Sequence, residues 1–203
     1  QRLNFFLMIN GRPGRGKTSL ILNLVAKRGK LYNKKFDRVF VFSPSLLTMT
    51  KNPFSDLPEN QLHTDLTEEN LTEALEDIKE SGEKILFILD DVVNDMKKSA
   101  AVQTLLSKML MNRRHLAGSG GSTSFIITTQ VYNKVPAPIR KTELDTIYDE
   151  LIIVPIKDFY DILKYCFDKK HNFVYIDVDK SYDKMFHKNF NALSFNSTNE
   201  TGL

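Results

Sequence analysis

The chain has 203 residues, of which 41% are hydrophobic and 26% are charged. These values are typical of a soluble globular protein with a sizeable core, and no apolar run approaches the roughly 20 residues that a membrane-spanning helix needs. The single cysteine, Cys166, excludes an internal disulfide and a cysteine-based metal site. The composition therefore favours one domain that covers residues 1–203.

The net charge of +3 is unevenly distributed along the chain. Residues 1–51 hold eleven Lys or Arg and one acid, whereas residues 52–95 hold two Lys and thirteen acids. A basic end of this kind suits a polyanion such as nucleic acid. A solvated surface explains it equally well, because the sequence has no dense basic tail.

The first motif in the chain is Gly11-Arg12-Pro13-Gly14-Arg15-Gly16-Lys17-Thr18, which matches the P-loop pattern G-x-x-x-x-G-K-T. The apolar run before it, residues 5–9, predicts a buried strand, and the spacing of apolar residues over 20–25 predicts a helix after it. A strand, this loop and a helix in that order indicate a phosphate-binding site.

In a P-loop, backbone N–H groups and the positive end of the following helix hold phosphate oxygens. Lys17 is expected to reach the β- and γ-phosphates, and the Thr18 hydroxyl is expected to bind Mg²⁺. The residues that we expect to surround bound ATP are Gly11, Arg12, Pro13, Gly14, Arg15, Gly16, Lys17, Thr18 and Ser19.

The next elements are a strand, an irregular stretch and a helix. Residues 38–42 are β-branched and aromatic and end at Ser43-Pro44-Ser45, which predicts a strand that closes in a loop. Residues 46–66 are expected to be irregular. Thr67 is expected to cap a helix that carries apolar residues at helical spacing from Leu71 to Ile78.

The run Ile85-Leu86-Phe87-Ile88-Leu89-Asp90-Asp91 has the Walker B pattern of a buried strand that ends in two acids. A parallel strand delivers such residues to the edge of the sheet where ligands bind. Asp90 is expected to hold Mg²⁺, and Asp91 to act as the general base that orients the attacking water. The alternative for Asp91 is that it caps the following helix.

A helix with apolar residues from Val102 to Leu110 is expected next, followed by a flexible glycine-rich connection over 118–122. Residues 124–129 then predict a strand with Gln130 at its end. An amide at that edge can sense the γ-phosphate or position water. The alternative is that Gln130 hydrogen-bonds a loop.

The remaining expected elements are a short turn and helix over 135–140, strands at 151–154 and 173–177, and a helix over 158–167. Strands that alternate with helices predict an α/β fold with three layers and a mostly parallel central sheet. We expect the core at about 3–155 and a C-terminal helix, strand and tail at about 156–203, all within a single P-loop ATPase domain.

The order of these motifs resembles that of the FtsK–HerA superfamily of P-loop ATPases, and most closely the poxvirus-type DNA-packaging ATPases of large DNA viruses and virophages. The resemblance rests on the P-loop, on Asp90-Asp91, on Arg113-Arg114-His115 and on the segment from Gln130 to Arg140. In the additional-strand class to which these proteins belong, the strand that ends in Gln130 lies between the two motif strands.

The resemblance implies a ring of five or six identical subunits that uses ATP and Mg²⁺ to push double-stranded DNA into a preformed capsid. It implies a partner at the capsid vertex or a membrane-associated capsid component, and a location in the cytoplasmic viral factory or the virion. An arginine from the neighbouring subunit would stabilise the transferred phosphoryl group. Arg114 is the first candidate, Arg113 the second and Arg140 the third; a cation-favouring helix end is the alternative for the Arg pair.

Two other functions remain open from the sequence. A nucleotide kinase also begins with a P-loop, although it needs a lid with arginines and an acceptor site. A DNA-binding protein that uses ATP only as a switch would share the same motifs.

Overall fold

The computed structural model describes residues 3–25, 35–48, 52–131, 134–139, 156–169, 172–177 and 180–193. The chain divides into two compact units, residues 1–142 and 143–203, and each is described by itself. The composition and the order of the motifs predicted one domain with its core ending near residue 155. The boundary between the two compact units lies earlier than that, and whether both units act as one domain stays a prediction.

The first unit is built on a sheet that has five strands in the described ranges, all of them parallel. Their order is β1-β5-β4-β2-β3. The strands are β1 (Phe6–Asn10), β2 (Arg38–Phe42), β3 (Leu62–His63), β4 (Lys84–Asp90) and β5 (Ser122–Thr129). The all-parallel sheet confirms the predicted α/β fold. The strand β5 lies between β1 and β4, as the additional-strand arrangement requires.

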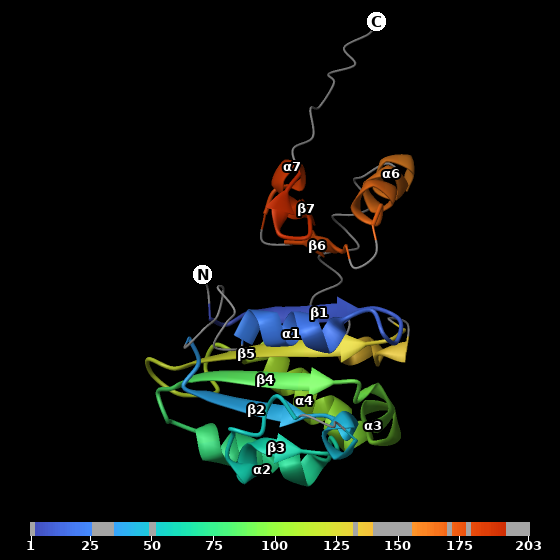
Figure 1. Ribbon diagram of the computed structural model, residues 1–203. Helices are drawn as coiled ribbons and strands as arrows, with labels where there is room; N and C mark the ends of the chain where they lie inside the picture. Colours follow the sequence, from blue (N-terminus) through green and yellow to red (C-terminus); the bar gives the residue numbers. More distant parts are fainter. Residues whose placement is uncertain are drawn as a thin grey trace, which may run out of the picture. The chain divides into compact units, whose positions relative to one another are not determined.

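Helices cover both faces of this sheet, which gives the three expected layers (Figure 1). On one face, α1 (Lys17–Val25) packs Ile21 against Leu86, Ile88 and Ile126. On the other face lie α2 (Glu68–Ile78), α3 (Val93–Lys98) and α4 (Ala100–Met111). The strands are buried on both faces, so they read as continuous apolar runs in the sequence.

Stacked phenylalanines fix the register of the three central strands. The ring centroids of Phe40 and Phe87 are 5.1 Å apart, and those of Phe87 and Phe125 are also 5.1 Å apart. These residues are aligned partners on β2, β4 and β5. Because the strands are parallel and in this register, their carboxyl ends lie at the same edge of the sheet.

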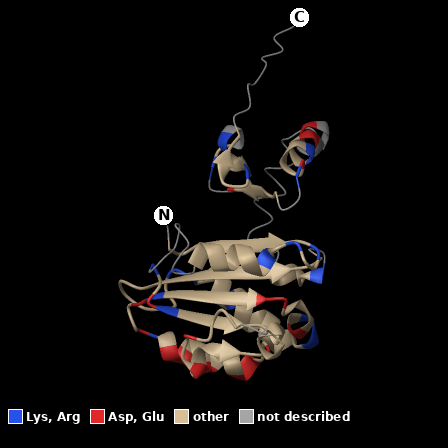
Figure 2. Ribbon diagram, in the orientation of Figure 1, with Lys and Arg blue, Asp and Glu red and all other residues tan. Residues whose placement is uncertain are grey.

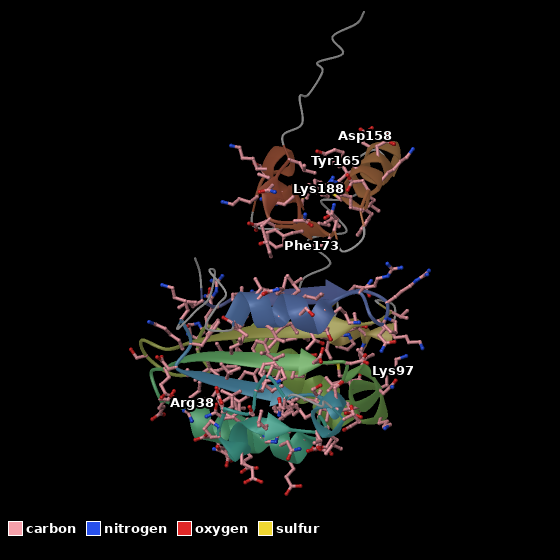
Figure 3. All side chains as sticks on the ribbon, in the orientation of Figure 1. Arg38, Lys97, Asp158, Tyr165, Phe173 and Lys188 are labelled. Atoms are coloured by element: carbon pink, nitrogen blue, oxygen red, sulfur yellow. The ribbon has the colours of Figure 1, made fainter. Side chains whose placement is uncertain are left out.

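Polar contacts cap the start of α2 and join its last turn to the sheet. Thr67 caps the helix as expected, since its side chain accepts a hydrogen bond from the Asn70 backbone N–H at 3.1 Å. At the start of β2, the Arg38 guanidinium lies 2.6 Å from Glu83 and 2.8 Å from Asp77 of α2 (Figure 3). Asp77 belongs to α2, along which Figure 2 shows several acidic residues in red.

Two segments differ from the sequence-based expectation. The stretch 46–66 includes a short strand, β3, because Leu62 and His63 pair with the exposed edge of β2. The segment 118–122 forms a close-packed turn instead of a flexible connection. A Cβ on Gly118 would lie 2.8 Å from the Glu80 Cα, and Gly118 has a φ of +77° that favours glycine.

The second unit contains a small antiparallel sheet with the order β6-β7-β8 in its described part. Its elements are α6 (Ile156–Cys166), β6 (Val174–Ile176), α7 (Tyr182–Met185), β7 (Phe186–Lys188) and β8 (Asn191–Ala192). The expected helix and last strand are therefore present, although the strand belongs to a separate sheet. The strand expected at 151–154 lies outside the described residues.

Lys188 links the sheet of the second unit to α6. Its ammonium group lies 2.8 Å from Asp168 and 4.2 Å from the centre of the Tyr165 ring. Figure 3 labels Lys188 and Tyr165 next to each other. Ile162, Cys166, Met185 and Phe186 form the small core underneath. Throughout the described ranges of both units, no helix combines the length and the apolar character needed to cross a membrane.

A buried hydroxyl at the start of β5 gives a prediction about stability. The Thr123 side chain is 0% exposed, and its Oγ1 has no hydrogen-bond partner among the described residues. We expect Thr123→Val to raise the free energy of unfolding by about 1 kcal/mol, because it removes an unpaired polar group from the core. Urea unfolding checks this, and a loss of stability would contradict it.

His63 gives a second prediction, about pH. Its ring stacks on Phe42 at 4.5 Å, and burial lowers its pKa below the ordinary value of 6.5, although Glu73 partly opposes this. The unfolded chain then binds the proton more readily, so this contribution to stability is lost as the pH falls through about 6.5. We expect His63→Phe, which keeps an aromatic ring, to lose less stability than the wild type between pH 7.5 and 5.5 in urea unfolding. An equal loss in both proteins would contradict this.

Candidate nucleotide-binding site

The P-loop motif, Gly11 to Thr18, covers the connection from β1 to α1 and the first residues of α1, at the carboxyl edge of the sheet. Gly14 and Gly16 have φ angles of +69° and +84°, which side-chain-bearing residues rarely adopt. The Gly11 N–H donates to the Thr129 carbonyl at 3.0 Å, so the loop is attached to the end of the neighbouring strand β5. These features give the loop the curvature and the anchorage of a phosphate cradle.

Lys17, the first residue of α1, has its ammonium group over the loop. Its Nζ donates to the carbonyl oxygens of Gly11 at 2.7 Å and Arg12 at 3.4 Å. No carboxylate in the described part of the chain pairs with it, so its charge is available to an anionic ligand. The residues from Gly14 to Ser19 line a hollow of about 300 Å³ beside it.

Asp90 lies at the end of β4, two strands away from β1, and is only 5% exposed. Its Oδ1 accepts a hydrogen bond from the Thr128 hydroxyl at 2.6 Å, and its Oδ2 accepts one from the Ser43 hydroxyl at 3.2 Å. Thr128 belongs to β5 and Ser43 follows β2, so both neighbouring strands hold this carboxylate.

Asp91 adopts a left-handed backbone conformation with φ +58°. Its backbone N–H donates to the Thr128 Oγ1 at 3.0 Å. The capping alternative for Asp91 does not hold, because α3 is preceded by Val92 and has no side-chain cap. A strained conformation of this kind is common at functional sites, and Asp tolerates it better than most residues.

Gln130 follows β5 and lies beside Asp91. Its Nε2 donates to the Asp91 Oδ2 at 2.6 Å. The Gln130 side chain is exposed. Its hydrogen-bond partner is a carboxylate of the site, whereas the alternative expected a partner in a loop. The structure thus brings Lys17, Asp90, Asp91 and Gln130 to one edge of the sheet, as the sequence predicted.

The groups at this edge fit a magnesium nucleotide. Lys17, the loop N–H groups and the α1 N-terminus offer positive charge to phosphates, and Thr18 with Asp90 offers the hard oxygen ligands that Mg²⁺ prefers. No cluster of three or more His, Cys, Asp or Glu that could hold a metal occurs within the described ranges. A magnesium ion here would therefore rely on nucleotide phosphates and water for its other ligands.

Arg113 and Arg114 lie at the opposite edge of the sheet. The Arg113 guanidinium donates to the carbonyls of Asn4 at 2.9 Å and Leu110 at 3.0 Å. Leu110 is in the last turn of α4, so this contact matches the alternative of a cation at a helix end. The exposed Arg114 lines a hollow with Leu3, Asn4 and Ser122.

Neither arginine can therefore reach the P-loop of its own chain, which lies at the carboxyl edge. Any contact with a nucleotide would need a second copy of the chain. Arg140, the third candidate, lies outside the described residues.

Sequence reasoning missed two residues at this site, Ser43 and Thr128. Ser43 was expected only to begin a loop after a strand, and Thr128 only to lie in the strand that precedes Gln130. The signal that could have found them is the register, since it places the ends of β2 and β5 on either side of Asp90.

A family model of the NACHT domain matches residues 6–130, which is more than half of the chain. The match begins with β1 and ends at Gln130, so it includes the P-loop, both aspartates and β5. No curated protein matches the sequence. The NACHT domain is a P-loop NTPase domain, which agrees with the fold and with the groups at the carboxyl edge. The chain therefore belongs to the NACHT domain family of P-loop NTPases.

Proposed function

We propose that this domain hydrolyses ATP to move double-stranded DNA, and that it packages a viral genome into a preformed capsid. The observation that carries the ATPase part is that Lys17, after β1, lies at the same edge of the sheet as Asp90 and Asp91, at the end of β4. The same edge includes Gln130, whose amide lies 2.6 Å from Asp91.

Each group has a role in hydrolysis that its position supports. The loop N–H groups and Lys17 hold the phosphates, so that the γ-phosphorus faces the attacking water. Thr18 and Asp90 would hold Mg²⁺, which neutralises charge on the phosphate oxygens. Asp91 orients the water and accepts its proton as the bond to ADP breaks, and Gln130 holds one oxygen of Asp91 so that the other faces the water.

The DNA part rests on the likeness to the FtsK–HerA packaging ATPases. The insertion of β5 between β1 and β4 agrees with that likeness. Charge gives further support, because exposed cations lie near the carboxyl edge, where Figure 2 shows blue ribbon on the loop before α1 and near α3. They are Arg12, Arg15, Lys97, Lys98 and Lys134. Cations near one edge suit the phosphate backbone of DNA.

A motor of this kind works as a homo-oligomeric ring, which we propose here with five or six subunits. The exposure of Arg114 and its place at the edge opposite the P-loop suit a role on the nucleotide of a neighbouring copy. An arginine supplied in this way can raise the rate by a factor of about 10³–10⁵. Arg113 is the weaker candidate, because its guanidinium already bonds two carbonyls.

The two carboxyl-edge residues Lys17 and Asp91 give the first test. We expect Lys17→Ala to abolish hydrolysis, and Asp91→Asn to keep nucleotide binding while lowering turnover by about 10²–10⁴-fold. Phosphate release and binding of a fluorescent ATP analogue measure the two properties. Glu76→Gln, on the exposed side of α2, is the control and should keep wild-type turnover. Near-normal turnover of Asp91→Asn would overturn the role of this residue as the base.

Stimulation by DNA gives the second test. Linear double-stranded DNA should raise the ATPase rate under conditions in which the chain assembles, because a translocating motor hydrolyses ATP faster when it is bound to DNA. Heparin, a polyanion without base pairs, is the control and should raise the rate less. A rate that DNA leaves unchanged would contradict the motor and favour an ATP switch, and phosphate transfer to added nucleosides or nucleotides would indicate a kinase.

A further inference from the structure

The carboxylate of Asp90 is the most buried acid at the site, and both of its oxygens accept a hydroxyl hydrogen bond. Thr128 donates to Oδ1 at 2.6 Å and Ser43 donates to Oδ2 at 3.2 Å. Ser43 and Thr128 are 1% and 0% exposed, so these bonds lie in a place that water does not enter freely. Hydrogen bonds of this kind to a charged acceptor are stronger than those between neutral groups.

The two hydrogen bonds fix the orientation of the carboxylate and leave some of its lone pairs free for other partners. A carboxylate has about four lone-pair positions, two on each oxygen, and each hydroxyl occupies one of them. The remaining positions can serve a metal ion or its water. With one bond to each neighbouring strand, the carboxylate cannot rotate without breaking one of them.

The Thr128 hydroxyl has a second contact. Besides donating to Asp90, it accepts the backbone N–H of Asp91 at 3.0 Å. One hydroxyl therefore connects the residue that we propose as the metal ligand to the residue that we propose as the base. This contact also supports the left-handed backbone of Asp91, which costs free energy in an L-residue.

Ser43 has a different second contact. Its Oγ accepts the Ser45 N–H at 3.3 Å and so caps the short 3₁₀ helix η1 (Pro44–Leu47). Among the described residues, no hydrogen bond joins its side chain to Asp91. The two hydroxyls therefore share Asp90 and differ in what else they hold.

We propose that Ser43 and Thr128 are positioning residues that set the affinity of the site for Mg²⁺, and that Thr128 also positions the base. This inference rests on the proposed ATPase function. Groups that hold a metal ligand in place commonly change metal affinity or activity by about 10–100-fold when they are removed.

The test compares hydroxyl-lacking variants with variants that keep the hydroxyl. The full chain binds a fluorescent ATP analogue in EDTA and in increasing Mg²⁺. We expect Thr128→Val and Ser43→Ala to keep the affinity measured in EDTA, because the P-loop is unchanged, and to need about 10-fold more Mg²⁺ for the metal-dependent gain. Thr128→Ser keeps the hydroxyl and should restore the wild-type Mg²⁺ requirement.

A split between the two variants tests the second contact of Thr128. At saturating Mg²⁺, turnover of Ser43→Ala should recover, whereas turnover of Thr128→Val should stay about 10-fold low, because the base remains misplaced. Thr123→Val is the matched control. It makes the same change at the other end of β5, and it should leave the Mg²⁺ requirement unchanged.

The outcomes separate this inference from the function on which it rests. If the wild type shows no Mg²⁺-dependent nucleotide binding, the proposed ATPase function fails. If the wild type binds normally and both hydroxyl-lacking variants keep its Mg²⁺ requirement, the positioning role is overturned. Equal losses in EDTA and in Mg²⁺ would also overturn it, because they would place the hydroxyls in support of the loop alone. Thermal unfolding identifies a variant that fails to fold, and the other hydroxyl-lacking variant then carries the comparison.

Discussion

A carboxylate at the end of a central strand is costly to bury unless hydrogen bonds replace its water. Asp90 meets this condition because the hydroxyls of Thr128 and Ser43 approach it from the strands on both sides. The condition holds only if β2, β4 and β5 end at the same level. The stack of Phe40, Phe87 and Phe125 sets that level, so the packing of the core and the chemistry of the edge depend on one register.

The same register places two groups of residues at opposite edges of the sheet in the first unit. The P-loop, the two aspartates and Gln130 follow the carboxyl ends of the strands, whereas Arg113 and Arg114 lie where β1 and β5 begin. In a parallel sheet, the amino edge and the carboxyl edge of one chain stay apart. For a nucleotide to meet both, a second copy must bring its amino edge to the first copy's carboxyl edge, which is a head-to-tail contact of the kind that closes into rings.

Local sequence patterns predicted several elements of this structure correctly. The P-loop, the strand that ends in Asp90 and the Thr67 cap are present as predicted, because each depends on neighbours a few residues away. Features that depend on distant neighbours were missed. The short strand β3 forms because the edge of β2 is available, and the turn at Gly118 is packed because Glu80 lies against it. The separate antiparallel sheet that includes β6 was not predicted either.

The sequence by itself determined the class of protein, because a glycine-rich loop with Lys17 and a strand ending in paired aspartates need no tertiary information to be recognised. It also predicted that Gln130 follows a strand, whereas the place of that strand beside the aspartates was implied only by the resemblance to the FtsK–HerA superfamily. Only the tertiary structure decided that Asp91 bonds Gln130 instead of capping α3, and that Ser43 and Thr128 hold Asp90. The reason is that these contacts join residues some 40 positions apart, and the pairing of parallel strands alone brings such residues together.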